Sequence, residues 1–179
     1  MRSFVRLLAL VFILVFMAAC ASPGKPESLA EQNVEQLQVG LTSKHPSAYL
    51  YLSRALWQSD QKDDAVVMYY VGQIRYRAYI NTLSAPEDLA EVQLYESLKA
   101  DIGDDLNEYA ARNLDNWLSL IDRALQWHRD EPSEFLPKSD YSLLYELMIY
   151  NFDKLREYIA NNKELIRSQR AAQGLVNEL

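Results

Sequence analysis

The chain has 179 residues, of which 49% are hydrophobic, 11% aromatic and 24% charged, and this composition excludes a disordered, collagen-like or coiled-coil protein. Only 5 glycines and 6 prolines are available for turns, which disfavours a hairpin-rich all-β sandwich. The length fits one domain, and a globular part of this size buries roughly 70% of its unfolded surface without needing a disulfide. Long helices joined by short turns are therefore expected.

The N-terminus has the pattern of a secretory signal peptide. Arg2 and Arg6 precede an apolar run of 11 residues, 7–17, and the small residues Ala18 and Ala19 follow it. The run is shorter than the about 20 apolar residues that a membrane-spanning helix needs. An uncleaved anchor and an ordinary signal peptide with a chance cysteine remain as alternatives.

The segment Met17-Ala18-Ala19-Cys20 resembles the bacterial lipobox, although Met17 stands where Leu is usual. The resemblance implies that residues 1–19 are removed and that Cys20 receives acyl chains, palmitate among them. Residues 20–27 then form the lipidated cysteine and its tether, and residues 28–179 form a single helical domain. Ala21 and Ser22 follow the cysteine, which resembles the outer-membrane class, so we expect a lipid-anchored domain facing the periplasm.

Removal of the signal peptide leaves an acidic domain. Only 16 of the 18 basic residues remain against 25 acidic ones, a net charge of −9. Nucleic-acid binding needs clustered lysines and arginines, so nucleic acid is not an expected partner. An anionic lipid surface repels such a domain as well, which leaves the lipid as the expected membrane attachment.

Apolar residues recur at helical spacing along the mature chain, which predicts an all-α array of about seven antiparallel helices. Capping residues are expected at Ser28 and Ser84, and helix ends at Gly40, Gly103 and Gly174. The expected helices cover residues 28–40, 46–58, 63–81, 84–103, 104–109, 114–130 and 139–174, with the longest internal loop at 131–137. No stretch alternates with a two-residue period, so no strand is expected.

Residues 47–76 read as two amphipathic helices joined by a polar turn. The small residues Ala65 and Gly72 bracket the bulky Tyr69. This spacing resembles the tetratricopeptide and Sel1-like repeats and implies that Ala65, Tyr69 and Gly72 form the contact between the two helices. Ser53 stands where the repeat favours Gly, and no second copy follows, so a regular solenoid is doubtful. Any other helical hairpin is the alternative, and no family resemblance covers the whole chain.

The second of these helices is rich in tyrosine and arginine, which are both frequent in binding sites. The mature chain has 12 tyrosines but only 2 phenylalanines, and tyrosine combines apolar area with a hydroxyl that needs a partner. We interpret Tyr70, Gln73, Arg77 and Tyr79 as candidate partner-binding residues. The alternative is that the tyrosines line a helical core, and that Arg75 and Arg77 pair with the abundant acids.

No catalytic, cofactor or metal motif is evident. His45 and His128 stand in no metal-ligating pattern, and the scattered glycines make no phosphate-binding loop. The acidic cluster at 101–108 fails as a calcium loop because Leu106 stands where Gly is required.

We therefore expect a non-enzymatic module, without cofactors, that binds an unidentified envelope or toxin protein. A pilotin-like envelope assembly factor is the leading interpretation. The alternative is an immunity lipoprotein that neutralises a toxin delivered to the periplasm. A carboxylate-dependent hydrolase of the envelope is a further and weaker alternative.

Overall fold

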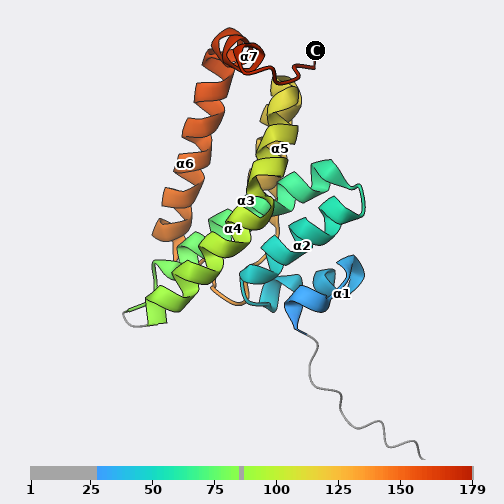
Figure 1. Cartoon of the computed structure of the whole chain (residues 1–179). Helices are drawn as coiled ribbons and strands as arrows, with labels where there is room; N and C mark the ends of the chain where they lie inside the picture. The colour runs from blue at the N-terminus through green and yellow to red at the C-terminus, as the bar shows by residue number, and fades with distance from the viewer. Residues whose placement is uncertain (1–27, 85–86, 179) are drawn as a thin grey trace, which may run out of the picture.

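The computed structural model describes residues 28–84 and 87–178, and within them it contains helices and turns but no strand (Figure 1). This confirms the all-α prediction. The seven α-helices are α1 Val34–Gln38, α2 Ser47–Gln58, α3 Lys62–Ile80, α4 Glu87–Arg112, α5 Leu114–Asp130, α6 Ser142–Asn161 and α7 Lys163–Ala172, with short 3-10 turns η1 Leu29–Glu31 and η2 Leu41–Ser43. The predicted signal peptide, lipobox and tether, with Cys20, lie outside the described residues.

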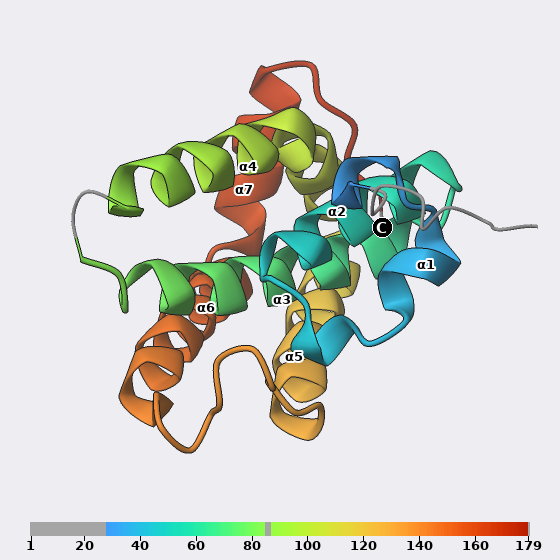
Figure 2. The same ribbon diagram turned by 90° about the horizontal axis from the view of Figure 1, so that it is seen from below.

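Helix α3 forms the centre of the molecule. It packs against α2, α4, α5 and α6, and Figure 2 shows it running between α4 and α6. Twelve of its 19 residues are buried, which is typical of a helix covered on most sides. One helix with four packing partners is incompatible with a solenoid, in which each unit contacts only its neighbours.

The α2–α3 hairpin is held by a close approach of the two helices. A Cβ atom placed on Gly72 would lie 2.8 Å from Leu50 Cδ2 and 3.1 Å from Tyr49 Cβ, so only glycine fits unless the Leu50 side chain or α2 moves. The Ser53 hydroxyl donates a 2.6 Å hydrogen bond to the carbonyl of Ala65, and both residues are fully buried. The small residues of the pattern therefore do lie between the two helices.

Tyr69, expected in the same contact, reaches a different helix. Its hydroxyl donates to the carbonyl of Lys99 on α4 at 3.3 Å. A Cβ atom on Gly103 would lie 2.4 Å from this hydroxyl. Gly103 therefore makes room for Tyr69 inside a continuous α4, and the predicted helix end at Gly103 and separate helix at 104–109 are wrong.

The C-terminal helices also differ from the prediction of one helix over 139–174. The Ser139 hydroxyl donates to the Asp140 carboxylate at 2.8 Å instead of capping a helix, and α6 begins three residues later, at Ser142. The side chain of Asn162 donates to the Tyr158 carbonyl at 2.7 Å, which competes with the helical hydrogen bonds and separates α6 from α7.

The N-terminal segment is less helical than expected. Ser28 and Glu31 do form a capping box, but it closes only the 3-10 turn η1, and α1 is 5 residues long. Gly40, with a φ of 61°, separates α1 from η2 as predicted. No helix in residues 28–84 or 87–178 has the length and apolar character required to cross a membrane.

Candidate functional site

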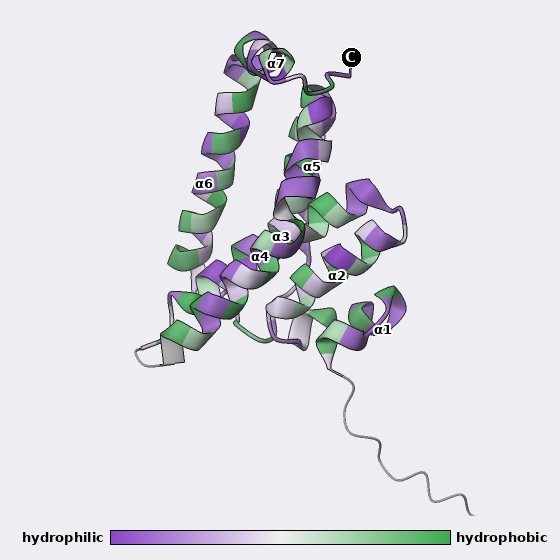
Figure 3. Ribbon diagram, viewed as in Figure 1, coloured by the Kyte–Doolittle hydropathy of each residue, from purple (hydrophilic) through white to green (hydrophobic). Residues whose placement is uncertain are grey.

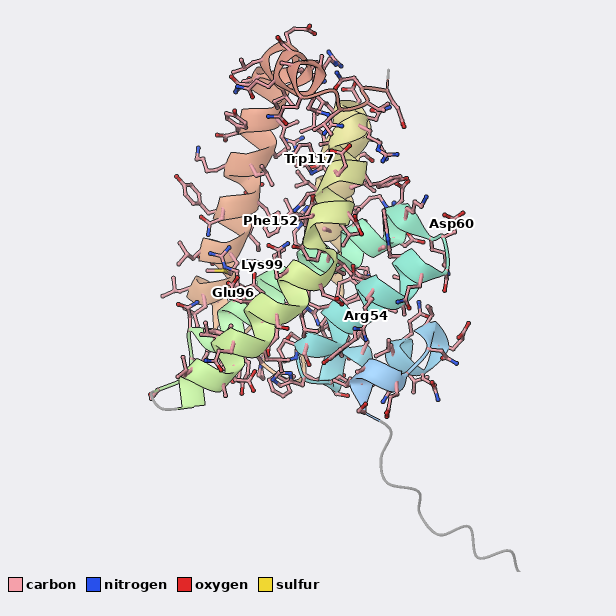
Figure 4. All side chains as sticks on the ribbon, in the orientation of Figure 1. Arg54, Asp60, Glu96, Lys99, Trp117 and Phe152 are labelled. Atoms are coloured by element: carbon pink, nitrogen blue, oxygen red, sulfur yellow. The ribbon has the colours of Figure 1, made fainter. Side chains whose placement is uncertain are left out.

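A groove of about 610 Å³ opens over α3 and is bounded by α4, α5 and α6. We call it the α3 groove. Three of the four candidate partner-binding residues line it, namely Tyr70, Gln73 and Arg77. Figure 4 labels Lys99, Trp117 and Phe152, which bring α4, α5 and α6 to the same groove.

Aromatic side chains form the floor of the groove. Trp117 Nε1 donates to the Tyr70 hydroxyl at 2.7 Å, and the Tyr70 ring centroid lies 5.3 Å from that of Phe152. Tyr70 is only 2% exposed, and its burial raises the pKa of its hydroxyl. The Tyr70 hydroxyl is therefore engaged within the fold, and the ring offers the groove an apolar edge.

Several polar side chains of the groove have no partner within the described residues. Gln73 and Arg77 lie one turn apart on α3, and both are partly buried. Asn107 on α4 and Asn151 on α6 stand on the two walls. In residues 28–84 and 87–178 no hydrogen bond or ion pair reaches the side chains of these four residues. The groove thus combines an apolar floor with hydrogen-bonding groups that no other described residue engages, of which Asn107 and Asn151 are exposed to solvent.

Arg77 is exceptional among the arginines of the described part of the chain. The other eight each make a hydrogen bond or an ion pair: Arg54 with Asp101, Arg75 with Tyr49, Arg112 and Arg170 with Glu108, Arg123 with Asp64, Arg129 with Gln126, Arg156 with Asp122 and Arg167 with Glu164. The Arg77 side chain makes neither a hydrogen bond nor an ion pair. Burial raises the pKa of the Tyr95 hydroxyl, and the nearby charge of Arg77 opposes this rise.

The remaining charges of the groove are one paired cation and one acid. Lys99 Nζ lies 2.5 Å from a carboxylate oxygen of Glu96 on the same helix. Asp104 is the one carboxylate among the groove residues that the structure describes. Burial, assisted by the charges of Asp104 and Glu96, raises the pKa of Tyr69 to about 12.

Arg75 contrasts with Arg77 although only one residue separates them. Arg75 is 2% exposed, and its guanidinium donates to the Tyr49 hydroxyl and, at 3.0 Å, to the Glu131 carbonyl. It also lies 4.9 Å and 4.8 Å from the ring centroids of Tyr49 and Trp127. Arg75 therefore holds the end of α5 against the hairpin through aromatic rings and a carbonyl. The alternative considered from the sequence, in which Arg75 pairs with acidic residues, differs from this arrangement.

Tyr79, the fourth candidate residue, lies outside the groove. Its ring centroid is 5.2 Å from those of His45 and Phe135, in edge-to-face geometry. His45 is enclosed further by Tyr76, at 5.3 Å, and its Nε2 lies 3.4 Å from a Glu91 carboxylate oxygen. The α3 groove therefore contains Tyr70, Gln73 and Arg77 without Tyr79.

A second concavity, of about 720 Å³, lies between η2, the hairpin and α5. Four of its polar side chains pair with one another, whereas Gln38, Gln61 and Glu131 have no side-chain hydrogen bond or ion pair within the described residues. Arg123 lies 2.5 Å from Asp64, and the Gln126 amide donates to both Asp130 oxygens at 2.8 Å. Although this concavity is larger, the α3 groove is the better candidate site, because it contains an arginine without a counter-charge, Arg77, and three of the four predicted binding residues.

Sequence reasoning missed the two groove walls. Asn151 sits among the apolar residues of α6, and a polar residue on an apolar helix face was the available signal. Nothing local marks Lys99 or Asn107, because their role depends on α4 lying beside α3. The described residues contain no group of three or more His, Cys, Asp or Glu side chains able to hold a metal ion. No protein-family model, curated protein or solved structure matches this chain.

Proposed function

We propose that this protein is an outer-membrane lipoprotein whose periplasmic helical domain binds another envelope protein and catalyses no reaction, in the manner of a pilotin. The supporting observation is the α3 groove, where an aromatic floor adjoins four polar side chains without internal partners. Protein interfaces combine an apolar centre with polar groups that pair across the interface. A groove of this composition favours a protein partner whose polar groups pair with these side chains.

The lipobox supplies the second half of the proposal. Residues 20–27 reach at most about 29 Å when fully extended, at about 3.6 Å per residue. An acylated Cys20 would therefore keep Ser28 and the domain behind it close to the membrane surface. A binding module at this place meets membrane-embedded partners at a high effective concentration.

A hydrolase has weaker support. Glycoside hydrolysis uses two carboxyl groups that face each other across the substrate, one of them protonated at neutral pH. Asp104 is the single carboxylate among the described residues of the α3 groove. The pKa values of Glu108 and Asp115 are lowered, by Arg170 and Lys163 respectively, which favours ion pairing over acid catalysis.

The anchor is tested with Cys20→Ser. We expect this variant to lose acylation, which mass spectrometry of the purified chain measures, and to leave the washed outer-membrane fraction. A variant that remains in that fraction would contradict the lipoprotein assignment.

Partner binding is tested by placing a photo-crosslinking amino acid at Asn107 or Asn151 in the full-length protein in cells. Ser168, exposed on α7, is the matched control position. We expect protein adducts from the two groove positions and none from position 168. If position 168 yields the same adducts, or if no position yields any, a dedicated partner-binding groove is refuted.

A further inference from the structure

We infer that the α3 groove recognises a carboxylate: an amphipathic segment of a partner protein places its apolar side chains on the aromatic floor and an Asp or Glu on Arg77 and Gln73. This inference rests on the proposed function and specifies the chemistry of the partner.

The first support is the missing counter-charge of Arg77. In a chain with 25 acidic residues, eight of the nine described arginine side chains have a hydrogen-bonding or ionic partner, whereas the Arg77 side chain has none. Removing an unpaired cation from water is costly. A partly buried arginine is therefore expected to gain an anionic partner. Carboxylate is the protein group that matches the planar fork of a guanidinium best.

The second support is the placement of Gln73. Residues four apart on a helix lie on the same face, so the Gln73 amide and the Arg77 guanidinium point into the same part of the groove. A carboxylate has two oxygens and accepts several hydrogen bonds. Arg77 and Gln73 together offer donors to both oxygens. The amides of Asn107 and Asn151, on opposite walls, remain for the backbone of the bound segment.

The third support identifies a protein segment as the source of the carboxylate. Leu143, Leu147, Asn151 and Leu155 follow each other at four-residue intervals along one ridge of α6. Asn151 and Leu155 line the groove, whereas Leu143 and Leu147 are 78% and 51% exposed. Figure 3 shows hydrophobic residues recurring along α6. An apolar ridge that continues from the groove onto the open surface fits a segment longer than a small acid.

The acidity of the domain makes this contact selective. A net charge of −9 repels acidic segments over most of the surface. This repulsion does not cancel a short-range contact with an uncompensated cation, because exposed charges more than about 8–10 Å away are screened at physiological salt. The ion pair therefore fixes the position of the segment, while the aromatic floor supplies the apolar contact.

The experiment uses the full-length protein in cells, with the photo-crosslinking amino acid at Asn151 as the probe. Mass spectrometry identifies the partner residue that it labels. Arg77→Glu places a negative charge against the partner carboxylate, and we expect at least a tenfold loss of adduct. Arg77→Lys should retain part of the yield. Arg129→Gln, which removes an exposed arginine of α5, is the matched control and should leave the yield unchanged.

Charge reversal in the partner completes the test. Replacing the Asp or Glu nearest the labelled residue by Lys should restore the adduct in the Arg77→Glu protein. Thermal melting of Arg77→Gln and Arg77→Glu should match the parent, because no hydrogen bond or ion pair within the described residues is lost. If Arg77→Glu unfolds the domain, the same yields are read with Arg77→Gln, whose neutral amide should also weaken the adduct.

The outcomes separate the inference from the proposed function. Adducts that persist at full yield in both Arg77 variants would overturn carboxylate recognition while leaving partner binding intact. A labelled segment without an acidic residue, or one belonging to a second copy of this chain, would overturn it too. The absence of adducts from every groove position would instead refute the partner-binding function itself.

Discussion

Replacing Gly72 tests whether the close approach of α2 and α3 is as tight as the structure has it. In Gly72→Ala the new methyl carbon would lie 2.8 Å from Leu50 Cδ2, 3.1 Å from Tyr49 Cβ and 3.2 Å from Leu50 Cγ. Leu50 and Tyr49 are each 1% exposed, so neither side chain has free space into which it can move. The methyl group must therefore push α2 away from α3 or force Leu50 out of its rotamer.

Two opposing terms determine the net effect. Alanine is a better helix former than glycine by about 0.8–1 kcal/mol. Overpacking a buried contact typically costs about 1–3 kcal/mol. We expect a net loss of about 1 kcal/mol, which lowers the melting temperature by about 2–4 °C in a domain of this size. Gly72→Leu adds three more carbons at the same place and should cost about 3 kcal/mol or more.

Urea unfolding followed by circular dichroism measures these free energies. Ser119, which is exposed on α5, is the control position. The difference in stability between Ser119→Gly and Ser119→Ala measures the difference in helix propensity alone. Leu50→Ala should relieve the clash, so the double variant should be more stable than the sum of the single losses by about 1 kcal/mol. A rise in stability on Gly72→Ala equal to that at Ser119, without coupling to Leu50, would refute the close approach.

The remaining predictions concern buried polar groups. Burial, with the charge of Arg75 nearby, lowers the pKa of His128 from 6.5 to about 3. As the pH falls, His128 therefore becomes protonated in the unfolded chain before it does so in the folded protein. The free energy of unfolding should decrease as pH drops from about 6.5 toward 3. His128→Gln should flatten that part of the profile of urea midpoints against pH, and an unchanged slope would rule out the assignment. Arg170 donates to both Glu108 oxygens, at 2.8 and 3.1 Å, and at 2.6 Å to the Val176 carbonyl. Arg170→Met should lower the free energy of unfolding by about 1–3 kcal/mol and should accelerate amide hydrogen exchange more in α7 than in α3. Equal acceleration in both helices would argue against Arg170 holding α7 to the domain.

Local patterns were sufficient to predict the helical hairpin and its neighbours. Small residues at Ala65 and Gly72 indicated where α2 and α3 meet, because a mid-helix glycine is unfavourable unless a neighbour occupies the space. Gly103 shows the limit of the same reasoning. A glycine that ends a helix and a glycine that admits a ring from another helix look alike in sequence, and only the position of Tyr69 distinguishes them.

The candidate site was predictable only on the helix that lies beneath it. Tyr70, Gln73 and Arg77 share one side of α3, so their spacing sufficed to group them. Tyr79 is two residues beyond Arg77 and thus about 200° around the helix from it, which explains its place beside His45. The walls come from distant segments, since Lys99 lies 22 residues and Asn151 lies 74 residues after Arg77. No local sequence signal indicates that these segments lie beside α3.

The central position of α3 has a consequence for how the chain can be shortened. The helix that covers Tyr70 with Phe152, α6, begins 62 residues after α3 ends. A chain that stops before α6 would leave this aromatic surface open to water, so it should aggregate instead of persisting as a smaller domain. Repeat proteins tolerate the loss of a terminal unit because each unit contacts only its neighbours. Here the last fifth of the chain completes the environment of the first hairpin, and the domain should fold and unfold as one cooperative unit.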